Sequence, residues 1–148
     1  MAEIEIHGMD ELIDAFFAIE EVPDEITQDM LTSGGKVLRD EVEKSGRNMG
    51  VYDPESNVHI LDHITLGKPV IGDSGGKIAV KFSGSRKNGN GKSRRNSTIA
   101  FFNEFGARGR LPRPFVRVAI EQNSDKITNA TGKPFYDWLE KHLKDKEE

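Results

Sequence analysis

Apolar residues in the first third of the chain recur three and four positions apart, which is the spacing of a helix face. Residues 8–23 carry one such stripe, formed by Met9, Leu12, Ile13, Phe16 and Phe17. Residues 23–46 carry a second stripe, formed by Ile26, Met30, Val37, Leu38 and Val42. Pro23 separates the two segments, because proline ends one helix and suits the first turn of the next. The pattern therefore predicts an N-terminal helical hairpin.

Gly34 and Gly35 lie in the middle of the second predicted helix. Each glycine there costs about 1 kcal/mol relative to alanine, so the pair needs a structural reason. Close approach of another backbone is one such reason, and a bend in the helix is another.

The spacing of apolar residues changes to alternation in the middle of the chain. Residues 68–84 predict a β-hairpin, because Val70 and Ile71 precede a turn at 73–76 and alternating Ile78, Val80 and Phe82 follow it. Residues 57–68 fit neither a helix nor a strand clearly. Residues 83–97 contain no apolar side chain and are rich in Gly, Asn and Ser, so we expect a long mobile loop there.

The last third returns to helical spacing. Residues 98–106 predict a strand or a short helix that ends at Gly106, and residues 113–130 predict a helix with Pro114 in its first turn. Gly132 and Pro134 are expected to end that helix, and residues 134–143 to form a last one. The expected fold is a single α+β domain over 1–148, in which an N-terminal helical hairpin and C-terminal helices pack on a small antiparallel β-sheet, with a long basic loop.

Composition narrows the class of protein. The 148 residues are 35% hydrophobic and 31% charged, which suits one domain with a modest core. There is no cysteine, so disulfides, thiol catalysis and cysteine-based metal sites are excluded, and the composition fits the cytosol. No apolar run approaches the length of a membrane span, and the acidic first residues do not resemble a signal peptide.

Charge is distributed very unevenly along the chain. Residues 77–117 hold eleven bases and a single acid, Glu104, whereas the remainder carries a net charge of −14. Such an uneven distribution of charge gives information about binding partners rather than about the fold. Three interpretations stay open: solvated loops, contact with nucleic acid, and contact with an acidic surface such as that of a second subunit.

No enzyme motif is indicated. The sequence around Gly91, Lys92 and Ser93 lacks the first glycine of a phosphate-binding loop and no apolar helix follows it. His59 and His63 lie four residues apart, but the third ligand and the glutamate of a catalytic zinc site are missing. We therefore expect no catalytic residue, no metal and no cofactor, and a protein that is not an enzyme.

Three blocks of the sequence resemble the head–tail joining proteins of long-tailed phages, also called tail-completion, neck or minor tail proteins (the gp-ten-like family of HK-type phages). The first is IHGMDELIDAF at residues 6–16, and the second is LTSGGKVLRDEVEKSG at residues 31–46. The third and most distinctive is IAFFNEFGARGRLPRPFVRVAIE at residues 99–121, where an aromatic segment ends in Glu-Phe-Gly and a Pro-Phe pair begins an apolar helix.

The resemblance implies a structural protein of the virion neck that joins a DNA-filled head to a tail, without catalysis. It would be present in the virion and, during assembly, in the host cytoplasm. Expected partners are further copies of the chain in a ring, the portal or adaptor proteins of the connector, and the tail terminator or tail tube protein. DNA in the lumen is a further possible partner, and a membrane is not expected.

The expected interface is the segment after the aromatic block. Phe101, Phe102 and Phe105 would anchor it in the core, and Glu104 would either accept hydrogen bonds from backbone N–H groups or pair with an arginine. The prolines restrict the chain, so that its arginines are presented to an acidic partner. The interface set is Glu104, Phe105, Gly106, Arg108, Arg110, Arg113 and Phe115.

The basic loop over 86–95 has two possible tasks. It could contact DNA phosphates without reading bases, or fold against an acidic neighbour such as the N-terminal helices of another copy. Its basic residues are Arg86, Lys87, Lys92, Arg94 and Arg95. The alternative functions are a small nucleic-acid-binding module that acts through this loop and a regulatory, antitoxin-like interaction protein.

Overall fold

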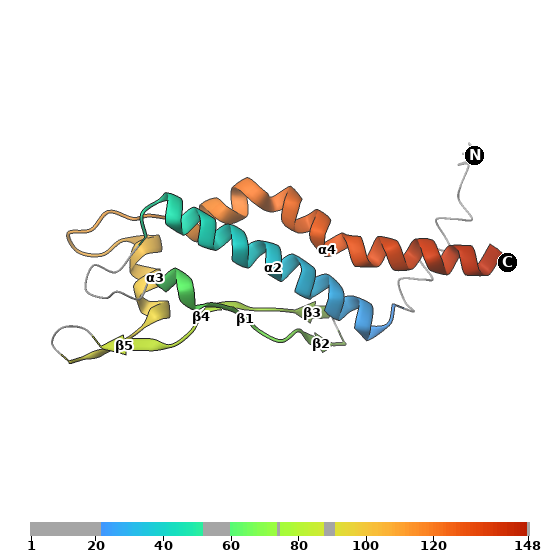
Figure 1. Ribbon diagram of the computed structural model, residues 1–148, viewed down its shortest axis with the longest axis horizontal. Helices are drawn as coiled ribbons and strands as arrows, with labels where there is room; N and C mark the ends of the chain where they lie inside the picture. Colours follow the sequence, from blue (N-terminus) through green and yellow to red (C-terminus); the bar gives the residue numbers. More distant parts are fainter. Residues whose placement is uncertain (1–21, 52–59, 74, 88–90, 148) are drawn as a thin grey trace, which may run out of the picture.

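The computed structural model describes residues 22–51, 60–73, 75–87 and 91–147, and within these ranges the chain is α+β (Figure 1). Its helices are α2 (Asp24–Asn48), the short 3-10 helix η1 (Ile60–His63), α3 (Asn96–Phe105) and α4 (Phe115–Glu147). Its strands are β1 (Ile64–Leu66), β2 (Val70–Gly72), β3 (Gly75–Lys77), β4 (Val80–Phe82), β5 (Ser85–Lys87) and β6 (Ser93–Arg95). The first predicted helix, and with it the predicted N-terminal hairpin, lies outside the described residues.

Helix α2 lies between the second half of α4 and the strands (Figure 1). Its two central glycines face these two neighbours. A Cβ on Gly34 would collide with the Thr131 side chain of α4, and a Cβ on Gly35 would lie 2.6 Å from Leu66 Cδ1. The structure therefore shows close approach of neighbouring elements at the glycine pair, made by side chains rather than by another backbone.

The expected helix break at Gly132 and Pro134 is wrong, because both residues lie inside the helical stretch of α4 that follows a kink at Asn123. The irregularity is at Asn123, whose φ and ψ of −124° and 18° leave the helical region. There the Asn123 side chain donates a hydrogen bond to the Ala119 carbonyl at 2.9 Å. The close packing of α4 on α2 lies one turn earlier, at Thr131 against Gly34, whereas Pro134 lines an open hollow between the two helices.

The strands form three separate antiparallel pairs in the described residues. β1 pairs with β4, with Ile64 opposite Phe82, and β2 pairs with β3, with Val70 opposite Lys77. The predicted hairpin over 68–84 is thus present at β2–β3, while β4 turns to a different partner. β5 pairs with β6, so the two ends of the expected long basic loop form a hairpin, and residues 88–90 between them lie outside the description.

The hydrophobic core lies at the end of the molecule where the last turns of α2, η1, α3 and the first turns of α4 meet. Phe115, Ile60 and Val51 have no exposed surface there, and the Phe82 ring meets Phe115 edge-on at 5.7 Å between centroids. The full core set is Val42, Val51, Ile60, Leu61, Ile99, Ala100, Phe115 and Ala119.

Replacing Gly34 with alanine tests the contact between the helices. On an open helix surface the change would stabilise by about 1 kcal/mol, but here the new methyl group meets Thr131, and overpacking costs about 1–3 kcal/mol. We expect Gly34→Ala to lower the free energy of unfolding in urea, and Thr131→Ala in the same chain to recover part of the loss. A stabilised Gly34→Ala protein would contradict the close approach.

A second contact between these helices predicts a dependence of stability on pH. Lys126 Nζ lies 2.5 Å from the carboxylate of buried Glu41, and this hydrogen bond holds the Glu41 pKa below its usual value although burial opposes the shift. A lowered pKa in the folded state stabilises at neutral pH, and the contribution is lost as pH falls through that pKa.

We therefore expect Lys126→Met to reduce stability at pH 7 by only about 1 kcal/mol, because the Lys126 side chain is largely exposed. The deficit should shrink as the pH falls below about 4.5, in urea titrations from pH 7 to 3. Lys144→Met, which removes an exposed pair with Glu140, is the matched control. A deficit that is constant with pH would show that Glu41 is not the group involved.

Candidate assembly interface

Helix α3 is fixed to the end of β4 by its first residue. The Asn96 side chain donates to the Ser83 carbonyl at 2.7 Å, and its backbone N–H donates to the Gly84 carbonyl at 3.0 Å. From this start one face of the helix is buried, with Ile99, Ala100 and Asn103 directed inward. The Asn103 side chain is satisfied within the helix by the Ile99 carbonyl at 2.9 Å.

The opposite face of α3 exposes two phenylalanines. Phe101 is 56% exposed and Phe105 is 68% exposed, and their ring centroids lie 4.8 Å apart. Phe102 is half-buried. The expectation that all three rings anchor the segment in the core is therefore wrong for Phe101 and Phe105, because the segment is a helix and the positions one and five residues beyond Ala100 point away from its buried face.

Glu104 joins α3 to the first turn of α4. Its two carboxylate oxygens accept hydrogen bonds from the backbone N–H groups of Val116, at 2.8 Å, and Arg117, at 3.0 Å. These N–H groups have no partner within a helix, and a carboxylate there also suits the helix dipole. Of the two alternatives for Glu104, the structure shows hydrogen bonds from backbone N–H groups.

A tight turn connects the two helices. The backbone groups of Ala107 and Arg110 bond to each other, and Gly109 supplies the positive φ of 78° between them. Gly106 also has a positive φ, of 82°, and a Cβ there would lie 3.0 Å from the Arg110 carbonyl oxygen. The position therefore requires glycine for both conformation and space.

The last residues before α4 are turned toward the chain itself. Arg113 donates from its guanidinium to the Gly50 carbonyl at 2.7 Å and from its backbone to the Asn103 carbonyl at 2.5 Å. Phe115 is fully buried. Of the predicted interface set, Phe115 is buried, while Phe105, Arg108, Arg110 and Arg113 are exposed, although the Arg113 guanidinium is bonded to the chain itself.

An open apolar groove of about 610 Å³ runs between α3 and the start of α4. Its apolar lining comes from Phe82, Ala100, Phe101, Phe105, Val116 and Ile120. Ile120 is 45% exposed, and at the edge Arg117 and Glu121 lie 3.9 Å apart. Sequence reasoning missed Phe101 and Ile120 as surface residues, although the four-residue spacing of 101 with 105 and of 116 with 120 is the pattern of a shared helix face.

Basic residues flank both ends of α3. Before it, the β5–β6 hairpin places Arg86 opposite Arg94, and the Arg94 guanidinium lies over the Phe102 ring at 5.8 Å. Arg95 directly precedes the helix, and Lys87 and Lys92 are exposed on the hairpin. After α3, Arg108 and Arg110 stand in the turn. Positive charge thus lies at both ends of α3, whereas the charged residues that line the groove itself are Arg117, Glu104 and Glu121.

Comparisons of the chain with protein-family models, with curated proteins and with solved structures give no match. Within the described ranges, no helix is both long enough and apolar enough to cross a lipid bilayer. The described residues also contain no cluster of three or more metal-ligating side chains.

Removing the Glu104 carboxylate should weaken the link between α3 and α4. We expect Glu104→Ala to lower the free energy of unfolding by about 1–2 kcal/mol, as loss of a helix cap does, and Glu104→Gln to cost less because one acceptor oxygen remains. Chemical denaturation measures both. Glu121→Ala, which removes only an exposed pair with Arg117, should cost less than about 0.5 kcal/mol. Equal losses for Glu104→Ala and Glu121→Ala would contradict the capping role.

Proposed function

We propose that this protein is a structural component of the phage neck, which completes the joint between head and tail by assembling as a ring. The groove between α3 and α4 would be its contact surface. The observation that carries the proposal is this groove, with two exposed phenylalanines and an exposed isoleucine on a rigid support.

Three features favour a binding surface over incidental exposure. Soluble monomers rarely expose grouped large apolar side chains unless another molecule covers them. The groove walls are fixed by the Glu104 hydrogen bonds and by the turn at Gly106, so little ordering is needed on binding. Arginines beside an apolar centre are also the arrangement typical of interfaces between proteins.

The resemblance supports the same surface. Its most distinctive block, residues 99–121, supplies most of α3, the connecting turn and the first turns of α4. These are the two walls of the groove, and Glu104 in the Glu-Phe-Gly element connects them. We expect the partner surface to be apolar at its centre and acidic at its edge. The proposed partners are the next copy in the ring, a portal or adaptor protein, or a tail terminator or tail tube protein.

The proposal is tested by electron microscopy of lysates from the phage that encodes this chain. We expect deletion of the gene to leave DNA-filled heads and complete tails unjoined, and a chain with Phe101→Asp and Phe105→Asp to fail to restore joining. Tyr136→Asp is the matched control, because Tyr136 is an aromatic residue of similar exposure, 66%, outside the groove.

Intact particles in the deletion lysate would overturn the proposed function. If the folded groove variant restores joining, the proposed function can still hold, but the groove is not the contact surface.

A second candidate function is nucleic-acid binding by the β5–β6 hairpin. It rests on the closely spaced Arg86, Lys87, Lys92, Arg94 and Arg95, a set suited to phosphate contacts. This function predicts that the isolated protein binds duplex DNA with an affinity that falls steeply with salt. It also predicts that Lys87→Glu with Lys92→Glu abolishes binding, whereas the groove variant leaves it unchanged.

A further inference from the structure

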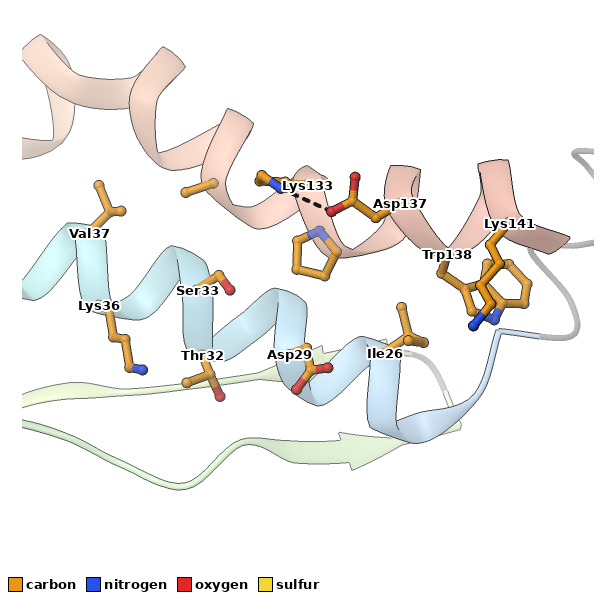
Figure 2. A pocket seen from close by; sticks show the side chains of 12 residues that line it. Ile26, Asp29, Thr32, Ser33, Lys36, Val37, Lys133, Asp137, Trp138 and Lys141 are labelled. Atoms are coloured by element: carbon orange, nitrogen blue, oxygen red, sulfur yellow. Dashed lines mark hydrogen bonds and ion pairs between the residues drawn. The ribbon is translucent and has the colours of Figure 1, made fainter. Parts of the chain in front are cut away.

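A second hollow, of about 880 Å³, lies at the other end of the helix pair, between the first half of α2 and the second half of α4 (Figure 2). Its apolar lining comes from Ile26, Val37, Ala130, Pro134 and Trp138. Figure 2 shows Ile26 pointing from α2 toward α4 and Trp138 pointing from α4 toward α2. The hollow therefore has an apolar floor that both helices build.

At this end of the molecule, few apolar side chains shield the apolar residues of α4 from water. No residue of α4 between Ile120 and Asp145 is buried in the described structure, although the segment contains five large apolar side chains that are half-buried. They are Ile127, Phe135, Trp138, Leu139 and Leu143. The core lies at the opposite end, around Phe115. A further apolar element is needed to exclude water from the floor of the hollow.

We propose that residues 9–21 of the same chain occupy this hollow, with the stripe of Met9, Leu12, Ile13, Phe16 and Phe17 against its floor. This segment lies outside the described residues, and its apolar spacing is that of an amphipathic helix. A helix of this kind that lays its apolar face into a groove is a common mode of recognition between proteins.

The length of the chain favours this occupant. The described residues begin at Val22, one helical turn before Ile26 at the end of the hollow. As a helix, residues 9–21 would be about 20 Å long, and the stretch of α2 from Ile26 to Val37 is about 17 Å long. Tethering by only Val22 and Pro23 also gives the segment a high effective concentration at this site.

The same argument excludes the other groove as a site for this segment in its own chain. The α3–α4 groove lies near the last turns of α2, where Gly46 faces Phe115. That point is about 30 Å along α2 from Ile26, so a helix about 20 Å long that is tethered at Val22 does not reach it.

Charge also favours the proposed occupant. Residues 1–21 hold seven acids and no lysine or arginine. The hollow is lined by three lysines, Lys36, Lys133 and Lys141, and by two aspartates, Asp29 and Asp137. Lys133 and Asp137 pair with each other at 3.0 Å, which leaves two lysines and one aspartate at the edge. An acidic segment is therefore complementary to the edge of the hollow, whereas a basic one is not.

The inference does not rest on the proposed function, but it has a consequence for that function. A hollow filled by the chain's own N-terminal segment is not available to a partner. The α3–α4 groove is then the apolar surface that the described part of the chain offers to another molecule.

Trp138 is the only tryptophan of the chain and lies in the hollow, so its fluorescence reports occupancy. We expect Phe16→Asp with Phe17→Asp, and separately deletion of residues 1–21, to shift the Trp138 emission to the red and to increase its quenching by acrylamide. The control is Phe101→Asp with Phe105→Asp, which should leave the emission unchanged. Unchanged emission in the first two variants would overturn the proposal.

A cross-link distinguishes the chain's own segment from that of a second copy. The chain has no cysteine, so Leu12→Cys with Ala130→Cys introduces a single pair, with Ala130 in the lining of the hollow. On mild oxidation of the full-length protein we expect a monomer with an internal disulfide, at all concentrations. Disulfide-linked dimers, or no cross-link in folded protein, would contradict docking within one chain.

Discussion

Helix α2 approaches α4 so closely at Gly34 that a β-carbon there would collide with the Thr131 side chain. This contact fixes the position of the long C-terminal helix, and with it most other parts of the fold. Farther along α2, Lys126 bonds to Glu41, and Gly46 leaves room for Leu61 and Phe115. Phe115 is the first residue of α4, so its packing against Gly46 also positions the first backbone N–H groups of α4, which bond to Glu104 of α3.

The molecule is asymmetric along the helix pair. At the Phe115 end, η1, α3 and β4 close a dry core, and the α3–α4 groove is hollowed into its outer surface. At the Ile26 end two helices enclose a hollow with lysines at its edge. We infer that the α3–α4 groove binds other molecules and that residues of the same chain fill the hollow between α2 and α4. Bases are in excess in residues 77–117, which include α3, and acids are in excess in residues 1–21.

The sequence predicted the α+β class and the long second helix, because helical spacing is a local signal, but it left two reasons open for the glycine pair. For Glu104 it left two alternatives open, and the structure shows the hydrogen bonds from backbone N–H groups. It did not predict that α4 continues through Gly132 and Pro134, because the preference of both residues for helix ends is a local signal that the full fold need not follow. Phe101 and Phe105 were assigned to the core because hydrophobicity alone does not say which face of a short helix is covered. The β5–β6 pairing was missed because its strands contain no apolar alternation.

The central claim is that the Phe101–Phe105–Ile120 groove is covered by another protein at the joint between head and tail. Electron cryomicroscopy of the neck of intact particles tests it most directly. The account predicts a ring of copies of this chain at the joint, each with α3 and the start of α4 against a neighbouring protein surface. Particles whose neck contains no copy of the chain, or copies whose groove faces solvent, would contradict it.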